Sequence, residues 1–312
     1  NLVSFDSPST FSPLLDFKPL PKEFARYELE SAFLVAFWSN LGIFFVALGC
    51  FLLSHALKRL LERRRKKNHW SFSVVQKVEA GALNFMIIYL YACLDDIIFG
   101  FVLDVQTNPF KGAFSWESFF VGLIFTGLGA GLIFWNIVIV KRYQRAKSRT
   151  EAGDFTEANE HWEVFYGDFN DADAWSQSFL AILGMRDWIS NLIITALYHL
   201  PLTQTISLVA VDVIMILFLI TKKPFVELRS KLAQYFFEVI VFLVHLSALL
   251  LHIQGDKVAP TAIGKIILCK LIMGLNYGLT IGNIVIILYE IAVIIISKIK
   301  EWRLERKQKI QV

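Results

Sequence analysis

The sequence lacks the residue patterns on which most enzymes and metalloproteins depend. Its three cysteines, Cys50, Cys93 and Cys269, lie in separate apolar runs, and no CxxC pair occurs, which argues against disulfides and zinc sites. No HExxH, P-loop or GxSxG motif is present, and the histidines show no metal-ligand spacing. We therefore expect no catalytic role, no cofactor and no bound metal.

Charge is also missing from long stretches of the chain. The 312 residues are 55% hydrophobic with a mean hydropathy of +0.53, and apolar residues form blocks near the roughly 20 residues of a membrane-spanning helix. Because an open sheet edge is unstable in lipid, we predict an all-α, polytopic membrane helical bundle. The seven predicted transmembrane helices cover residues 31–56, 81–104, 118–140, 178–200, 204–221, 234–253 and 264–297.

Lysine and arginine are distributed unevenly between the segments that link these helices. If residues 58–67 face the cytosol, the segments on that side hold 22 basic residues, against 6 on the other side. The positive-inside rule then places the N-terminus outside and the C-terminus inside. The predicted organisation is an extracellular lead-in (1–30), three transmembrane helices (31–140), a cytoplasmic basic and acidic insertion (141–177), four more transmembrane helices (178–297) and a basic cytoplasmic tail (298–312).

The insertion changes character along its length. Residues 141–149 are basic, whereas residues 150–177 are acidic and aromatic. Two interpretations stay open: a solvated acidic loop, or a lid folded onto the basic inner loops.

Several charged residues fall inside the predicted helices, where a charge costs about 2.5–3.5 kcal/mol on insertion scales unless it is paired or lines water. Counting depth at about 1.5 Å per residue predicts two charged layers. These layers either fix the register of the helices or coordinate a cation. The outer layer holds Asp95, Asp96, Asp212 and Lys270, and the inner layer holds Arg186, Asp187, Glu238 and Glu290.

The last predicted helix has two distinct faces. Gly274, Gly278 and Gly282 form a small-residue stripe, which predicts close packing against another helix. Asn276, Asn283 and Glu290 recur every seven residues and share a polar face, which either lines a cavity or hydrogen-bonds a neighbouring helix.

From about residue 165 the order of features is distinctive. Arg186 lies in the inner half of a helix, "LPLTQ" separates two spans, and residues 223–225 form a short "KPF" turn. Glu238 then opens a helix, and Asn283 lies in a long polar final helix. This order resembles the membrane domain of TRP-like proteins of fungi and protists, notably ciliates. The resemblance implies an ion channel-like bundle at the cell surface, in the plasma membrane or the membrane of a cilium.

One segment departs from that family. A TRP-type pore has a pore helix and a filter between its last two spans, and residues 254–263, "QGDKVAPTAI", are too few for both. Arg186 alone also cannot form a voltage sensor. We therefore expect a TRP-like module that anchors, and possibly transmits force or signal from, an extracellular portion of a larger surface protein.

The expected partners are a lipid bilayer with anionic inner-leaflet lipids and other protein subunits or an extracellular assembly, and not nucleic acid. Two alternatives stay open. The first is a cation-channel subunit with its permeation path along the last helix, and the second is a receptor or transporter with a ligand in the outer charged layer.

Overall fold

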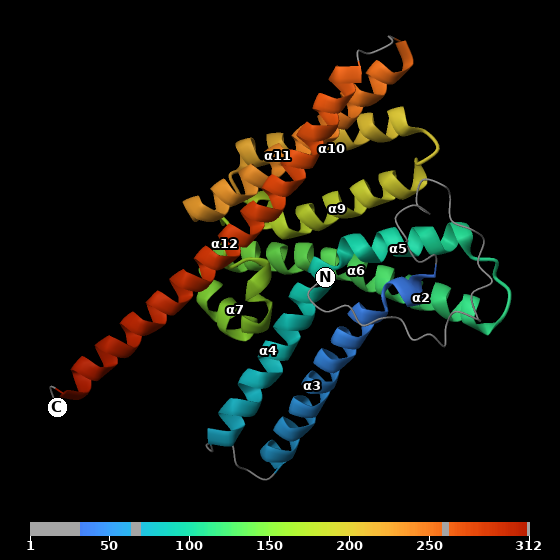
Figure 1. Cartoon of the computed structure of the whole chain (residues 1–312). Helices are drawn as coiled ribbons and strands as arrows, with labels where there is room; N and C mark the ends of the chain where they lie inside the picture. The colour runs from blue at the N-terminus through green and yellow to red at the C-terminus, as the bar shows by residue number, and fades with distance from the viewer. Residues whose placement is uncertain (1–31, 64–69, 258–261, 311–312) are drawn as a thin grey trace. The chain divides into compact units, whose positions relative to one another are not determined.

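The chain is helical throughout the residues that the computed structural model describes, which are 32–63, 70–257 and 262–310 (Figure 1). The all-α prediction is confirmed, and among these residues the only β pairing is a single antiparallel bridge between Phe169 and Phe225. The elements are α2 (Phe33–Ala36), α3 (Trp38–Arg63), α4 (Trp70–Ala92), α5 (Leu94–Thr107), α6 (Ala113–Ser148), α7 (Ala152–Ala158), the 3-10 helix η2 (Glu160–Phe165), α8 (Ala174–Gln177), α9 (Phe179–Ala196), α10 (Pro201–Lys222), α11 (Leu228–Lys257) and α12 (Ala262–Ile310).

The long helices account for the predicted spans. Within the described ranges, six helices are long and apolar enough to cross a membrane, and the bent pair of α4 and α5 makes a seventh if it crosses as one span. The chain is therefore an integral, multi-pass membrane protein. The sides on which the two termini lie stay a prediction, and the predicted lead-in of residues 1–30 lies outside the described residues.

Two of the predicted spans contain a break that no feature of the sequence predicts. The first span is divided at Phe37, where α2 ends and α3 begins. The second is divided at Cys93, where α4 and α5 meet at an angle of 55°. Neither break contains the proline or glycine that usually marks a kink, and the apolar run continues through both.

The helices form two compact units. The first comprises Asn1–Leu200 with Lys222–Val226, and the second comprises Pro201–Thr221 with Glu227–Val312. Helix α9 therefore belongs with the helices that precede it, whereas the sequence-based division grouped residues 178–297 together.

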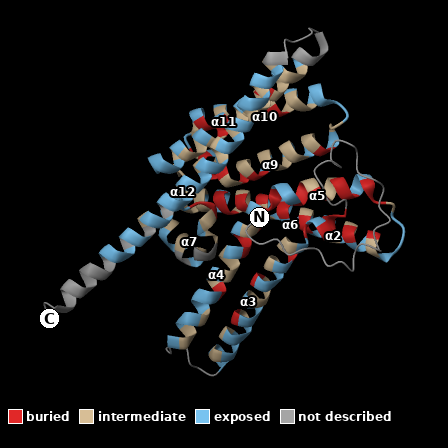
Figure 2. Ribbon diagram, viewed as in Figure 1, coloured by how far each residue is buried: buried red, intermediate tan, exposed pale blue. Residues whose placement is uncertain are grey.

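The core of the first unit lies where α2, α5 and α6 meet (Figure 2). Phe33, Ile97 and Phe125 are almost fully buried there. Two glycines of α6 permit this packing: a Cβ atom at Gly122 would lie 2.7 Å from Phe101, and one at Gly129 would lie 2.7 Å from Leu94. Burial of large apolar side chains against glycine thus holds α5 and α6 together.

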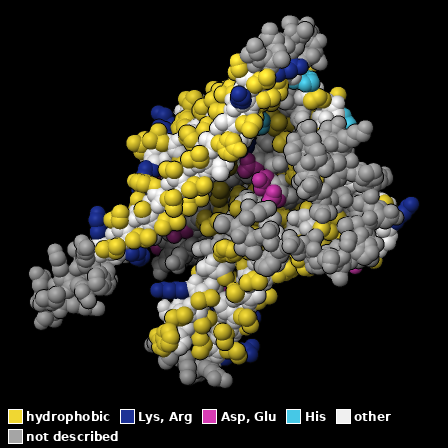
Figure 3. Space-filling view, viewed as in Figure 1, with side chains coloured by type: hydrophobic (Ala, Val, Ile, Leu, Met, Phe, Trp, Pro, Cys, Tyr) yellow, Lys and Arg dark blue, Asp and Glu magenta, His cyan; other side chains and the backbone are white. Residues whose placement is uncertain are grey.

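Helices α3 and α4 pack against each other as a hairpin that extends away from this core (Figure 1). Large apolar side chains such as Phe45, Leu53 and Leu57 are exposed on it. Figure 3 shows apolar side chains covering the visible faces of this hairpin. Such a surface fits contact with lipid, because exposed apolar patches of this extent are unusual in water.

The segment that follows α6 is folded and packed. We call residues 151–177, which contain α7, η2 and α8, the cap. Phe165 and Tyr166 of the cap are buried against Ile87, Ile139 and Val140 of α4 and α6. The cap is therefore packed onto α4 and α6, as the lid interpretation expects, and its cytoplasmic placement stays a prediction.

The cap is also attached by charge. Asp171 forms an ion pair with Lys147 at 2.7 Å, and Asp173 forms one with Lys222 at 2.9 Å. The basic residues come from the end of α6 and the end of α10, as the lid interpretation requires.

The second unit is built around the packing of α11 and α12. Helix α12 has 49 residues and continues into the predicted basic tail. At about 1.5 Å per residue its length is about 75 Å, more than twice the hydrocarbon core of a bilayer. Only residues 258–261 separate it from α11, which leaves no room for a pore helix.

Candidate functional site

The polar residues inside the predicted spans form the candidate site, and the bend at Cys93 explains the first of them. Asp95 and Asp96 lie in the first turn of α5. Acidic residues stabilise the N-terminus of a helix, where the unpaired N–H groups carry a partial positive charge. A bend in mid-span therefore creates a local environment that favours these two acids.

Arg186 and Asp187 on α9 form the second part. The guanidinium Nη1 of Arg186 donates to Oδ1 of Asp187 at 2.9 Å, and both side chains are half-buried. Helix α5, which carries Asp95, and helix α9 pack together. Residues assigned to different layers by depth counting therefore lie on two helices that are packed against each other in the first unit.

Asp212 on α10 is fully buried, and Nδ1 of His245 on α11 lies 2.6 Å from its Oδ2. Lys270, which was placed in the same outer layer as Asp212, is not its partner. Lys270 is exposed on α12 and makes no ion pair with any described residue. Depth counting gives the height of a residue in a span, but not the direction in which its side chain points around the helix axis.

Glu238 on α11 is 2% exposed, and its Oε1 accepts a hydrogen bond of 2.8 Å from Nε2 of Gln234, one turn earlier. Arg186 lies in the other unit, so the predicted contact between Arg186 and Glu238 stays a prediction. The side chain of Glu290 lies outside the described residues, and the contacts predicted for it also stay predictions.

Of the two faces predicted for α12, only part of the glycine face contacts another helix closely. A Cβ atom at Gly282 would lie 2.5 Å from Cε1 of Phe236 on α11, so this glycine permits the two helices to approach closely. Gly274 and Gly278 have open space at the same position. On the polar face, Asn276 and Asn283 are exposed, and Nδ2 of Asn276 donates to the Ile272 carbonyl oxygen of its own helix.

Sequence reasoning missed a buried acid at the end of α5. Asp104 is fully buried and accepts hydrogen bonds from the Phe33 backbone N–H, the Ser118 hydroxyl and Nδ2 of Asn108. These three donors come from the start of α2, from α6 and from the end of α5. Its carboxylate therefore joins three segments, and its position at the last residue of a predicted span hid this role.

A second missed acid lies between α3 and α4. Glu79 is 7% exposed and lies 2.7 Å from Nδ1 of His55 and 2.8 Å from Nζ of Lys58. His55 and Lys58 are three residues apart on one helix, so they reach the same carboxylate. The sequence signal was present in that spacing, but Glu79 precedes the predicted second span.

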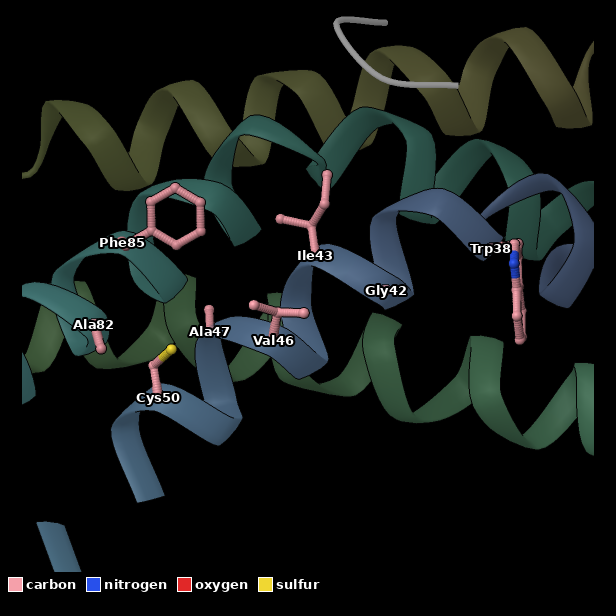
Figure 4. Close-up of a pocket in the computed structure, with 8 residues that line it drawn as sticks. All are labelled: Trp38, Gly42, Ile43, Val46, Ala47, Cys50, Ala82 and Phe85. Carbon is pink, nitrogen blue, oxygen red and sulfur yellow. The ribbon is translucent and has the colours of Figure 1, made fainter. Parts of the chain in front are cut away.

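A large apolar cavity lies between α3 and α4 and faces outward (Figure 4). Its volume is 740 Å³, and small residues such as Gly42, Ala47 and Ala82 line it. Trp38 and Phe85 are the large side chains of its wall. This space is of the size that ligands occupy, but its wall offers few polar groups to orient one.

The described charged groups of the spans do not gather into a metal site. Among the described residues, no group of three or more histidines, cysteines and acids is placed to hold a metal ion. Cys50 and Cys269 are exposed, Cys93 is buried, and all three thiols are free.

Comparisons with known proteins add no relative. No family model matches the chain, and neither a curated protein nor a solved structure matches it.

Proposed function

We propose that the chain is a multi-pass membrane module that anchors, and transmits force or signal from, an extracellular portion of a larger surface protein. The observation that carries this proposal is the pairing of polar groups across helices. Glu79 binds residues of α3, Asp104 joins α2, α5 and α6, and Asp212 binds His245 of α11. Paired charges of this kind fix helices relative to one another, as a rigid anchor needs.

The cap supports the same role. It is attached to α6 and α10 by Lys147 and Lys222 and is packed into the core by Phe165. A packed cap on one end of the spans is a route by which movement of the helices reaches a partner. The TRP-like resemblance, a plasma or ciliary membrane, and the expected protein partners belong to this proposal.

Reconstitution tests the anchor directly. We expect the purified chain in planar bilayers to pass no cation current, because Glu79, Asp104 and Asp212 are held by partners on other helices. A steady, protein-dependent cation current would contradict the anchor.

One observation favours a second candidate, a cation-channel subunit. Asp95 and Asp96 lie on α5, and Asp187 lies with its partner Arg186 on α9, which packs against α5. Three acids and one cation on two packed helices leave an excess of negative charge, which suits a cation. In that case Asp187→Asn and Glu290→Gln should each change cation conductance in patch recordings. Unchanged conductance in both variants would contradict a permeation path at these residues.

A further inference from the structure

A second cavity of the first unit lies where the cap meets α6 and α9. It has a volume of 320 Å³, at the lower end of the range for ligand pockets. At one end are Lys141 of α6, Trp175 of α8 and Ser178 at the start of α9. These side chains offer an ammonium group, an indole ring and a hydroxyl group.

The other end of the cavity is apolar. Ile137 lies one turn before Lys141 on α6, and Ile182 and Met185 lie one and two turns after Ser178 on α9. Both helices are candidate membrane spans, so the polarity of the wall falls from the cap toward the middle of the spans. A ligand that matches this wall has an anionic head and an apolar chain.

The ammonium group of Lys141 is available to bind the anionic head of such a ligand. The neighbouring acids of the cap are already engaged, since Asp171 pairs with Lys147 and Asp173 pairs with Lys222. Among the described side chains, neither Lys141 nor Arg145 one turn later forms an ion pair.

Ser178 gives an independent indication. The residue is 7% exposed and lines the cavity, and its hydroxyl makes no hydrogen bond within the described part of the chain. The hydroxyl is not among the buried polar atoms that lack a partner, so it is accessible and can donate to a ligand oxygen. Trp175 is 64% exposed beside it, as expected for an indole at the level of lipid headgroups.

We propose that this cavity binds an anionic phospholipid, with its phosphate held by Lys141 and Ser178 and an acyl chain lying against Ile137, Ile182 and Met185. The proposal rests on the membrane placement of α6 and α9 in the proposed function, but not on the anchoring role. Its consequence is that the bound lipid contacts the cap and both helices beneath it, so that lipid occupancy would stabilise the cap.

The test is titration of purified full-length chain in micelles with dioctanoyl phosphatidic acid, followed by native mass spectrometry. Dioctanoyl phosphatidylcholine and inorganic phosphate are the comparison ligands. We expect Lys141→Gln to weaken phosphatidic acid binding about tenfold, the effect of losing a hydrogen bond to a charged group. Lys147→Gln removes the same charge from the same helix outside the cavity. Its ion pair with Asp171 is exposed and weak, and the buried Phe165 and Tyr166 still hold the cap in place, so we expect less than about a twofold change.

A second variant tests the apolar end. Met185→Trp fills the cavity without touching Lys141, so it should also weaken phosphatidic acid binding while the circular dichroism spectrum stays unchanged. The proposal is overturned if Lys141→Gln and Lys147→Gln weaken binding equally, if inorganic phosphate binds as tightly as the lipid, or if the unaltered chain binds no phosphatidic acid. A cation current from the reconstituted chain would instead contradict the anchor and leave the lipid site standing.

Discussion

Polar residues have opposite roles in the core of the first unit and on the long helix α12. In the core, Asp104 is fully buried and joins three segments through donors on α2, α5 and α6. On α12, Lys270 and Asn283 are exposed, and Asn276 bonds to the backbone of its own helix. The same kinds of side chain in similarly apolar runs thus act as cross-links in one region and as surface in the other.

The largest expected effect comes from removing the cross-link at Asp104. Asp104→Ala leaves three buried donors without an acceptor, so we expect it to lower the free energy of unfolding by about 4 kcal/mol. Denaturant titration of the purified chain in micelles, followed by circular dichroism, measures the change. Asn276→Ala is the matched variant on α12 and should change the free energy of unfolding by less than about 0.5 kcal/mol. Equal effects from the two variants would remove the contrast between core and α12.

Asp212 tests whether the second unit has a cross-link of its own. Asp212→Ala removes the buried partner of His245, and we expect a loss of about 2.5 kcal/mol in the free energy of unfolding. Asp212→Asn keeps a side-chain oxygen that can accept from the imidazole and should lose less. The same denaturant titration separates the two variants, and an equal loss in both would show that the hydrogen bond contributes nothing beyond the charge.

The sequence predicted the helical architecture well because membrane spans depend on the length and apolarity of a segment, and both are visible in composition. The partners of polar residues were harder to predict, because they depend on how each helix is rotated about its axis. Asp212 was placed in one layer with Lys270 and contacts His245, while Asp95 and Asp187, placed in different layers, lie on helices that pack together.

The glycines of α6 show the same limit of sequence patterns. Gly127 and Gly131 have the four-residue spacing of a packing stripe, yet both face open space, and the close contacts occur at Gly122 and Gly129. A spacing of four residues identifies a stripe, but several stripes of one helix satisfy it, and only the packed structure selects among them.

The difference between packed and open glycines on α6 gives a third prediction, which compares two positions of the same helix. Gly129→Val places side-chain atoms against Leu94 and Trp188, and we expect it to lower the free energy of unfolding by about 1.5 kcal/mol. Gly127→Val introduces the same side chain into open space and should be close to neutral, since a branched residue is no worse in a helix than glycine. The denaturant midpoints of the two variants provide the measurement. A larger loss at Gly127 would mean that α6 presents a different face to its neighbours.

The smallest expected effect concerns the cap, where the ion pair between Asp173 and Lys222 is exposed to solvent. Burial alone would raise the pKa of Asp173, but the hydrogen bonds from the Ser176 backbone N–H and from Lys222 outweigh it and hold the pKa below its ordinary value of 3.8. Because the folded-state pKa is lowered, the contribution of Asp173 is complete at pH well above 3.8 and is lost as the pH falls through the lowered value.

We therefore expect amide hydrogen exchange in residues 170–177 to remain slow from pH 7 to about pH 4.5, after correction for intrinsic rates, and to quicken only below the ordinary carboxyl range. Asp173→Asn removes the titrating group, so its exchange should be faster at pH 7 and should lose this dependence on acid. The buried residues Phe165 and Tyr166 hold the cap by apolar contact, which does not titrate in this range, so their segment should stay protected in both proteins. Loss of protection at Phe165 together with residues 170–177 would mean that the ion pair with Lys222, and not the apolar contact, decides whether the cap stays folded on α6.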